Sequence, residues 1–378
     1  AQARSPRRPA RAAMAPFRLA ARASTPAKAG SLLVAESEAQ IQDAYYVGKQ
    51  WPQPHGSVVE IAQRTEAGTL GVLRDVRTVA KAKVKDLEVL RHEIAVMRSL
   101  DHPNILQLVE VFEDARHVFV LTERCAGGPL QRHLAKGPAL GEAEAAGLCR
   151  QVLKALRHMH ELRLCHRNIQ AETLWLLRDG AIGPGSALKL AGLELVSAVV
   201  GDKPLDEPCG APGYTAPEVL DRAYSVECDL WSCGVVVFYM LCGYPPFSGE
   251  TDEVVTRESY RGAFFFHPKH WRHVSESAKD FIRGLLQRKP SQRFSAAQAL
   301  HHSWLRSHAA PKAHLTAEKL KTLGGAGEQA ADGGSDSCSL DLELDADLPG
   351  VSCDLQSPIH VNSSSRPVLL LGSGFSTA

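Results

Sequence analysis

The sequence has almost no excess of charge of either sign. Its 378 residues include 43 basic and 42 acidic residues, which leaves a formal net charge of +1. A charge so close to zero gives no electrostatic reason to expect a nucleic-acid or membrane partner. Long hydrophobic runs are also missing, since the longest, at residues 235–242, is too short to span a bilayer. The nine cysteines include no Cys-x-x-Cys pair, which argues against a zinc site and predicts a soluble intracellular protein with reduced thiols.

The two ends of the chain have a biased composition. Residues 1–35 contain seven basic residues and no acidic residue, which is typical of an organelle transit segment, with a disordered basic tail as the alternative. The second interpretation implies a cytoplasmic location and the first an organellar one. Residues 325–378 contain eight acidic residues and one arginine among many Gly and Ser. Such a segment buries too little apolar surface to offset its chain entropy, so we predict disordered tails at 1–43 and 325–378.

The middle of the chain, residues 44–306, reads as one unit of two parts. Short β-rich runs are predicted at residues 57–62, 70–79, 109–113 and 118–122. A helix is predicted at residues 86–100, where Leu90, Ile94 and Met97 recur at helical spacing. Later helices are predicted at residues 142–160, 229–241, 275–286 and 295–302. We therefore predict an α+β fold with a β-rich lobe (about 44–122), a hinge (123–128) and a helical lobe (about 129–306), and a ligand site in the cleft between the lobes.

A series of motifs in this unit has the order and spacing of a known family. The motifs are Val84-Lys85-Asp86, His92-Glu93-Ile94, His102-Pro103-Asn104-Ile105, His166-Arg167, Gly213-Tyr214-Thr215-Ala216-Pro217-Glu218, Asp229-Leu230-Trp231 and His302-Ser303-Trp304-Leu305. Over about 260 residues they resemble the calcium-dependent and calmodulin-dependent Ser/Thr protein kinases. The resemblance implies a two-lobed protein kinase fold, with ATP in the cleft of the catalytic members.

The residues that build the scaffold of this fold are retained. The resemblance implies a buried ion pair between Glu218 and Arg293. It also implies that Asp229 accepts hydrogen bonds from the backbone of the catalytic loop at His166 and Arg167. The positions of the apolar spine that links the two lobes are Met97, Leu108, His166 and Leu193.

The residues that should hold the nucleotide are largely replaced. In the glycine-rich loop, prolines stand where two glycines belong and only Gly56 remains, so backbone N–H donors for phosphate are lost. Arg77 takes the place of the phosphate-binding lysine, where it can still pair with Glu93. Asp75 replaces an alanine that packs on adenine. Because residues two apart in a strand face the same way, Asp75 and Arg77 are predicted to pair inside the cleft.

The remaining walls of the cleft are altered in one important place. Trp175 replaces the leucine that forms the floor under adenine, and its larger ring is predicted to intrude into that space. Val58, Glu123 and Cys125 stand at the other cofactor-binding positions.

The catalytic loop has lost its proton acceptor and both of its metal ligands. Asn168 replaces the aspartate base, and an amide cannot accept a proton at useful pH. Gln170 replaces the lysine that steadies the phosphate. Thr173 and Gly192 replace the asparagine and aspartate that bind Mg²⁺. No cofactor is therefore expected, and any ATP that binds would do so without Mg²⁺.

Two functions are compatible with these losses. The first is a catalytically inactive kinase domain, a pseudokinase, that acts as a scaffold or allosteric regulator of a protein partner such as an active kinase. The alternative is a divergent Ser/Thr kinase that uses Arg77 and Glu194 in unusual roles. Residues 307–324 faintly resemble the junction that follows the kinase domain in calcium-dependent kinases. No closing glutamate completes the acidic alternation at 341–347, so direct calcium binding is not expected.

Overall fold

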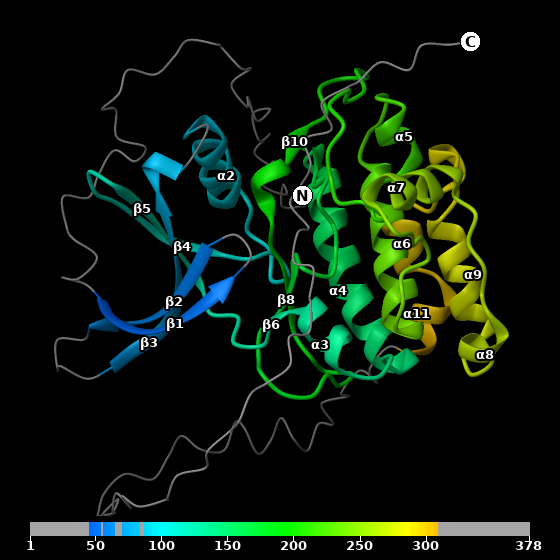
Figure 1. The fold of residues 1–378 in the computed structure, drawn as a ribbon, viewed down its shortest axis with the longest axis horizontal. Helices are drawn as coiled ribbons and strands as arrows, with labels where there is room; N and C mark the ends of the chain where they lie inside the picture. The colour runs from blue at the N-terminus through cyan, green and yellow to red at the C-terminus, as the bar shows by residue number, and fades with distance from the viewer. Residues whose placement is uncertain (1–44, 54–55, 65–69, 84–86, 309–378) are drawn as a thin grey trace, which may run out of the picture. The chain divides into compact units, whose positions relative to one another are not determined.

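The computed structural model describes residues 45–53, 56–64, 70–83 and 87–308 of the chain (Figure 1). The tails predicted at 1–43 and 325–378 lie outside the described residues. So does the junction predicted at 307–324, apart from its first two residues.

The amino-terminal lobe contains a five-stranded antiparallel sheet with strand order β1-β2-β3-β5-β4. Its strands are β1 (Tyr45–Gln53), β2 (Gly56–Arg64), β3 (Leu70–Ala80), β4 (Leu108–Glu113) and β5 (His117–Glu123). A 3₁₀ turn, η1 (Lys81–Lys83), follows β3, and one helix, α2 (Leu87–Ser99), lies between β3 and β4. The predicted β-rich runs and the predicted helix are confirmed to within a few residues.

Helix α2 forms where the apolar residues recur every three or four positions. Leu90, Ile94 and Met97 are buried along one stripe, as expected of an amphipathic helix. Glu88 in the first turn and Arg98 in the last turn complement the helix dipole. The buried stripe directs α2 toward the sheet and toward the helical lobe.

The carboxy-terminal lobe is mainly helical. Its helices are α3 (Leu130–Lys136), α4 (Glu142–Glu161), α5 (Pro217–Leu220), α6 (Glu227–Cys242), α7 (Asp252–Arg261), α8 (Pro268–Trp271), α9 (Glu276–Leu285), α10 (Ala296–Leu300) and α11 (Ser303–Ser307). The short strands are β6 (Gly128–Pro129), β7 (Leu164–Cys165), β8 (Leu174–Leu176), β9 (Leu188–Leu190) and β10 (Ser197–Ala198), with 3₁₀ turns η2 (Leu193–Leu195) and η3 (Pro290–Gln292). Strands β6, β8 and β9 form one small sheet, and β7 pairs with β10 in another.

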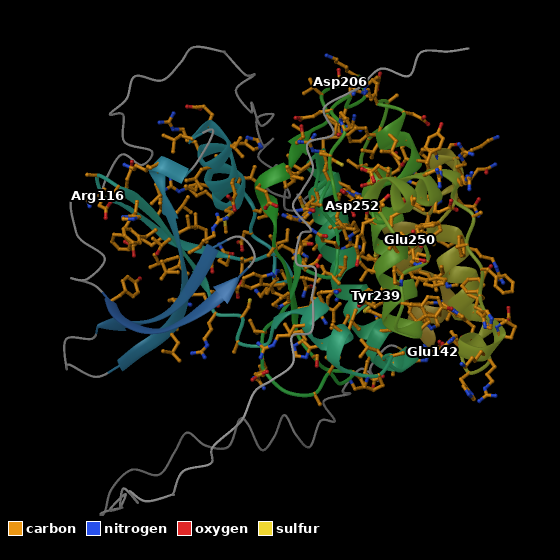
Figure 2. The ribbon with its side chains drawn as sticks, viewed as in Figure 1. Arg116, Glu142, Asp206, Tyr239, Glu250 and Asp252 are labelled. Carbon is orange, nitrogen blue, oxygen red and sulfur yellow. The ribbon has the colours of Figure 1, made fainter. Side chains whose placement is uncertain are left out.

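Helix α6 is the centre of this lobe. It is apolar on nearly every side and packs between α4 and α9 (Figure 1), as expected for a helix surrounded by protein. Glu142, labelled in Figure 2, ties the outer helices together from the first turn of α4. Its carboxylate accepts hydrogen bonds from the N–H and hydroxyl of Ser275 at 2.8 and 2.7 Å and from the indole of Trp304 at 2.8 Å.

Several hydrogen bonds join the two lobes. Leu106 N–H donates to the carbonyl of Leu190 at 2.9 Å, and a ring nitrogen of His92 on α2 bonds the carbonyl of Val196 at 2.8 Å. Helix α2 also contacts η2. These contacts hold α2 against the helical lobe, and contact among the spine residues Met97, Leu108, His166 and Leu193 stays a prediction. Within the described ranges, no helix is long and apolar enough to cross a membrane.

Candidate functional site

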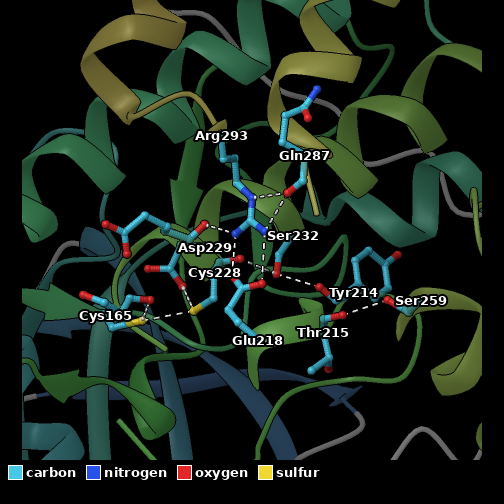
Figure 3. Close-up of polar contacts among 12 residues, drawn as sticks. Cys165, Tyr214, Thr215, Glu218, Cys228, Asp229, Ser232, Ser259, Gln287 and Arg293 are labelled. Carbon is cyan, nitrogen blue, oxygen red and sulfur yellow. Dashed lines mark hydrogen bonds and ion pairs between the residues drawn. The ribbon is translucent and has the colours of Figure 1, made fainter. Parts of the chain in front are cut away.

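The retained scaffold includes the expected ion pair between Glu218 and Arg293 (Figure 3). The two guanidinium NH₂ groups of Arg293 donate to the two oxygens of Glu218 at 2.5 and 3.1 Å. The same guanidinium donates to the carbonyls of Gln287 and Glu227. Both side chains are buried, so this bidentate pair ties α5 to the segment before α10 in a region of low dielectric.

Asp229 organises the catalytic loop from the first turn of α6. Its Oδ2 accepts from the N–H of His166 and from His160 Nε2, both at 2.9 Å, and its Oδ1 accepts from the N–H of Arg167 at 2.8 Å. Burial alone would raise the pKa of Asp229. The hydrogen bonds and charges of His160 and His166 have the larger combined effect, so the pKa of Asp229 is lowered. The ionised carboxylate holds Arg167 at a φ of +66°, a conformation that non-glycine residues rarely adopt.

His166 is fully buried beside Asp229. Its Nδ1 accepts from the N–H of Asn168 at 3.2 Å, and its Nε2 lies 3.1 Å from the carbonyl of Ala191. This arrangement fits a neutral ring with the proton on Nε2. Burial lowers the pKa of His166 to about 4, although the charge of Asp229 acts in the opposite direction.

The base position is closed by internal hydrogen bonds. Asn168 is buried, its NH₂ group donates to Glu194 Oε1 at 2.8 Å, and its amide oxygen accepts from Gln170 Nε2 at 3.0 Å. Both ends of the amide are therefore engaged within the protein. Gln170, which stands where the resemblance implies a phosphate-steadying lysine, and Glu194 thus both support Asn168.

The two metal-ligand positions lie against each other. The hydroxyl of Thr173 donates toward the carbonyls of Asn168 and Gln170 at 2.8 and 3.1 Å. Gly192 has a φ of +77°. A Cβ atom at Gly192 would lie 2.5 Å from the methyl carbon of Thr173, which is closer than packed atoms tolerate. An aspartate therefore cannot return to position 192 unless Thr173 moves.

Arg77 on β3 forms the expected pair with Glu93 on α2. The nitrogen–oxygen distance is 2.7 Å, and Glu93 is buried. Burial by itself would lower the pKa of Arg77, but the carboxylates of Glu93 and Glu194 raise it above its usual value. The guanidinium is therefore held by protein carboxylates at the position where the family places a phosphate-binding lysine.

Asp75 makes a contact that was not predicted. Its Oδ2 accepts from the backbone N–H of Cys125 at 3.0 Å, and the side chain is buried. Cys125 lies in the hinge, fifty positions along the chain. Arg77 therefore has the partner predicted from the sequence, whereas the bond from Asp75 to the hinge was not predicted, and the pairing of Asp75 with Arg77 stays a prediction.

The remaining cleft residues also have protein partners. Glu123 binds Lys189 at 2.7 Å and accepts from the N–H of Gln107 at 2.8 Å. Trp175 is half-buried on the face of β8 opposite Leu174 and Leu176. Its indole N–H donates to the carbonyl of Glu172 at 3.0 Å. Its intrusion into the adenine space stays a prediction.

The two strands that should flank the glycine-rich loop pair tightly. Gln53 at the end of β1 is opposite Gly56 at the start of β2, and Trp51 is opposite Val58. The two positions between these strands, and the side chain of Val58, lie outside what the structure describes. Only the backbone pairing of Gly56 and Val58 can therefore be compared with their predicted cofactor role.

A further cluster lies beneath the catalytic loop. The thiols of Cys165 and Cys228 are 3.4 Å apart, and with Asp229 they place three potential ligand atoms within 4.8 Å of one another (Figure 3). The hydrogen bond from Cys165 lowers the pKa of Cys228, but burial together with the charges of Asp229 and Glu218 raises it to about 11. Burial raises the pKa of both thiols, and Asp229 already holds the loop backbone, so the three side chains pack together beneath the loop.

Comparison with known proteins identifies the family. The family model described as "Protein kinase domain" matches residues 54–305, more than half of the chain. The chain therefore belongs to the protein kinase domain family.

Its similar relatives are calcium-regulated kinases by name. Calcium-dependent protein kinase 3 of Plasmodium berghei is 35% identical over 238 residues, which covers 63% of this chain and 42% of that protein. Calcium/calmodulin-dependent protein kinase type 1 of Macrobrachium nipponense is 36% identical over 251 residues, covering 65% of this chain and 72% of that protein. Calcium/calmodulin-dependent protein kinase type 1B of Rattus norvegicus is 34% identical over 281 residues, which covers 74% of this chain and 80% of that protein. The chain thus spans less than half of the length of the Plasmodium berghei kinase.

Proposed function

We propose that this protein is a catalytically inactive member of its family, a pseudokinase that acts as a scaffold or allosteric regulator of a protein partner such as an active kinase. The observation that carries the proposal is the hydrogen-bonded chain from Gln170 through Asn168 to Glu194. An amide with both ends engaged cannot take the proton of a substrate hydroxyl, and loss of a general base alone removes a factor of about 10²–10⁴ in rate. Thr173 and Gly192 add no carboxylate for Mg²⁺.

The same proposal includes a cleft that does not take ATP in the manner of catalytic kinases. Recognition of adenine needs backbone donors and acceptors that are open to the base. The N–H of Cys125 is engaged by the buried carboxylate of Asp75. A nucleotide that displaced Asp75 would leave a buried charged acceptor without this donor, at a cost of about 1–3 kcal/mol or more.

A divergent kinase is the second candidate, and one observation favours it. The Arg77–Glu93 pair, at 2.7 Å, keeps α2 in the inward position that phosphoryl transfer requires. In this alternative Arg77 contacts phosphate and Glu194 recruits a metal ion. It requires Glu194 to release the amide of Asn168, to which it is bonded at 2.8 Å.

Thermal unfolding with ATP tests the closed cleft. We expect ATP, with or without Mg²⁺ or Mn²⁺, to leave the melting temperature of the parent unchanged. Asp75→Ala combined with Trp175→Leu should gain stabilisation by ATP, because the hinge donor and the cleft floor are then restored. Each kcal/mol of binding raises the melting temperature by about 2–4 °C in a protein of this size. Each shift is measured against the same variant without nucleotide.

Asp101→Ala provides a matched control, since it removes an exposed acid of the same kind. ATP should leave the melting temperature of Asp101→Ala unchanged, as it does for the parent. Equal stabilisation of the parent and the double variant by ATP would contradict the closed cleft.

A further inference from the structure

The segment between α7 and α9 presents a phenylalanine to solvent. In the run from Phe264 to Phe266, the first and third rings pack inward on Phe238, with ring centroids 6.1 and 5.8 Å from it. Phe265 alternates to the outer face and is 69% exposed. A single exposed apolar side chain is common, whereas one that adjoins further apolar side chains at the surface marks an interaction site. We call residues 263–273 together with the outer face of α9 the Phe265 surface.

Two hollows lie on either side of Phe265. Both are lined by Phe264 and Phe265. The first, of about 620 Å³, is completed by Tyr244, Pro246, Ala263, His267 and His270. The second, of about 520 Å³, is completed by Phe266, Glu276, Lys279 and Arg283. An exposed ring between two depressions is a shape that can receive large side chains on both sides.

The charge of the Phe265 surface is positive. Residues 263–273 contain Lys269 and Arg272 and three histidines but no acidic residue. Among the described residues that line the hollows, Glu276 is the one acidic residue. It lies 2.8 Å from Lys279 and 3.9 Å from Arg283, so a single acid faces two cations.

We propose that the Phe265 surface docks a protein segment in which acidic residues alternate with large apolar ones. Apolar side chains would enter the hollows beside Phe265, and carboxylates would meet Lys269 and Arg283. A peptide fits better than a nucleic acid, because the walls are mainly aromatic and Glu276 offsets part of the positive charge. The surface lies at α8 and α9, on the edge of the helical lobe away from the sheet of β1 to β5 (Figure 1). Docking there does not depend on whether the cleft is catalytic.

Fluorescence anisotropy tests this docking with the full chain. The probe is a short fluorescein-labelled peptide that alternates leucine and aspartate. We expect saturable binding that weakens with added salt. Phe265→Ser should weaken it by about tenfold or more, since a central aromatic anchor carries much of the affinity of such contacts. Lys269→Glu should weaken it and reduce its salt dependence.

Matched controls separate docking from misfolding and from nonspecific binding. Val200→Ser removes another exposed apolar side chain, 75% exposed, and Arg98→Glu reverses an exposed charge on α2. Both should bind as the parent does. Phe265→Ser, Lys269→Glu and Val200→Ser should keep the parent's melting temperature, whereas Arg98→Glu is compared by binding alone, because Arg98 complements the dipole of α2. Equal binding of the parent and Phe265→Ser would overturn the proposal. So would equal binding of a serine–aspartate peptide, or tighter binding of single-stranded DNA, since either result would mean that charge alone is recognised.

Discussion

Arg293→Met is expected to lower the free energy of unfolding by about 3–5 kcal/mol. The substitution leaves Glu218 buried without its bidentate partner, and the carbonyls of Gln287 and Glu227 lose a donor. The guanidinium also lies over the ring of Trp231, 5.3 Å from its centroid, so its cation–π contribution is lost as well. Chemical denaturation of both proteins measures the difference.

An exposed ion pair gives the control for this prediction. Arg261 lies 2.8 Å from Glu258, and its side chain is 61% exposed. Arg261→Met should cost less than about 1 kcal/mol, because water screens the pair. The combination of Arg293→Met with Glu218→Gln should recover part of the loss, since no buried charge then remains. Equal costs for the buried and exposed substitutions would mean that the Glu218–Arg293 pair does not hold this lobe together.

Acid is expected to destabilise the protein through His166, by roughly 3 kcal/mol between pH 6.5 and pH 4. Burial lowers the pKa of His166 to about 4 from 6.5. Between these values the unfolded chain binds a proton that the folded protein does not. The stability that comes from the neutral His166 ring is therefore fully present above about pH 6.5 and is lost as the pH falls toward 4. The groups that face the ring are Asp229 and, through it, His160.

Urea unfolding at several pH values between 7 and 4 measures this slope. His166→Asn keeps an acceptor for the N–H of Asn168 but removes the titrating ring. Burial also lowers the pKa of His102, so the parent loses stability in acid for more than one reason. The difference between the parent and His166→Asn isolates His166, and it should shrink as the pH falls. A difference that is constant with pH would contradict the buried neutral ring.

The motifs were sufficient to predict the fold because their residues stabilise the conformation of the backbone. Glu218, Asp229 and Arg293 act through hydrogen bonds to the main chain and to each other, and the helical spacing of Leu90, Ile94 and Met97 predicts α2. Such roles depend on residue type and order, both of which a sequence contains.

The contacts of Asp75 and Glu123 with residues far along the chain were less accessible from the sequence. Asp75 meets Cys125 across fifty positions, and Lys189 meets Glu123 across sixty-six. Such pairs depend on the distance between strands. One signal was present: an aspartate in a buried strand, in place of an alanine, requires a donor. The pairing of Asp75 with Arg77 stays a prediction, and the hinge N–H of Cys125 is a partner that the sequence did not indicate.

Transfer of labelled phosphate from ATP tests the proposed loss of catalysis most directly. The full chain, purified twice, is incubated with γ-labelled ATP, Mg²⁺ or Mn²⁺ and a mixture of serine- and threonine-containing peptides. The account predicts no incorporation into peptide or protein above that of a matched sample carrying Arg77→Ala. Incorporation that persists through the second purification and disappears with Arg77→Ala would contradict it, and would establish the divergent kinase in its place.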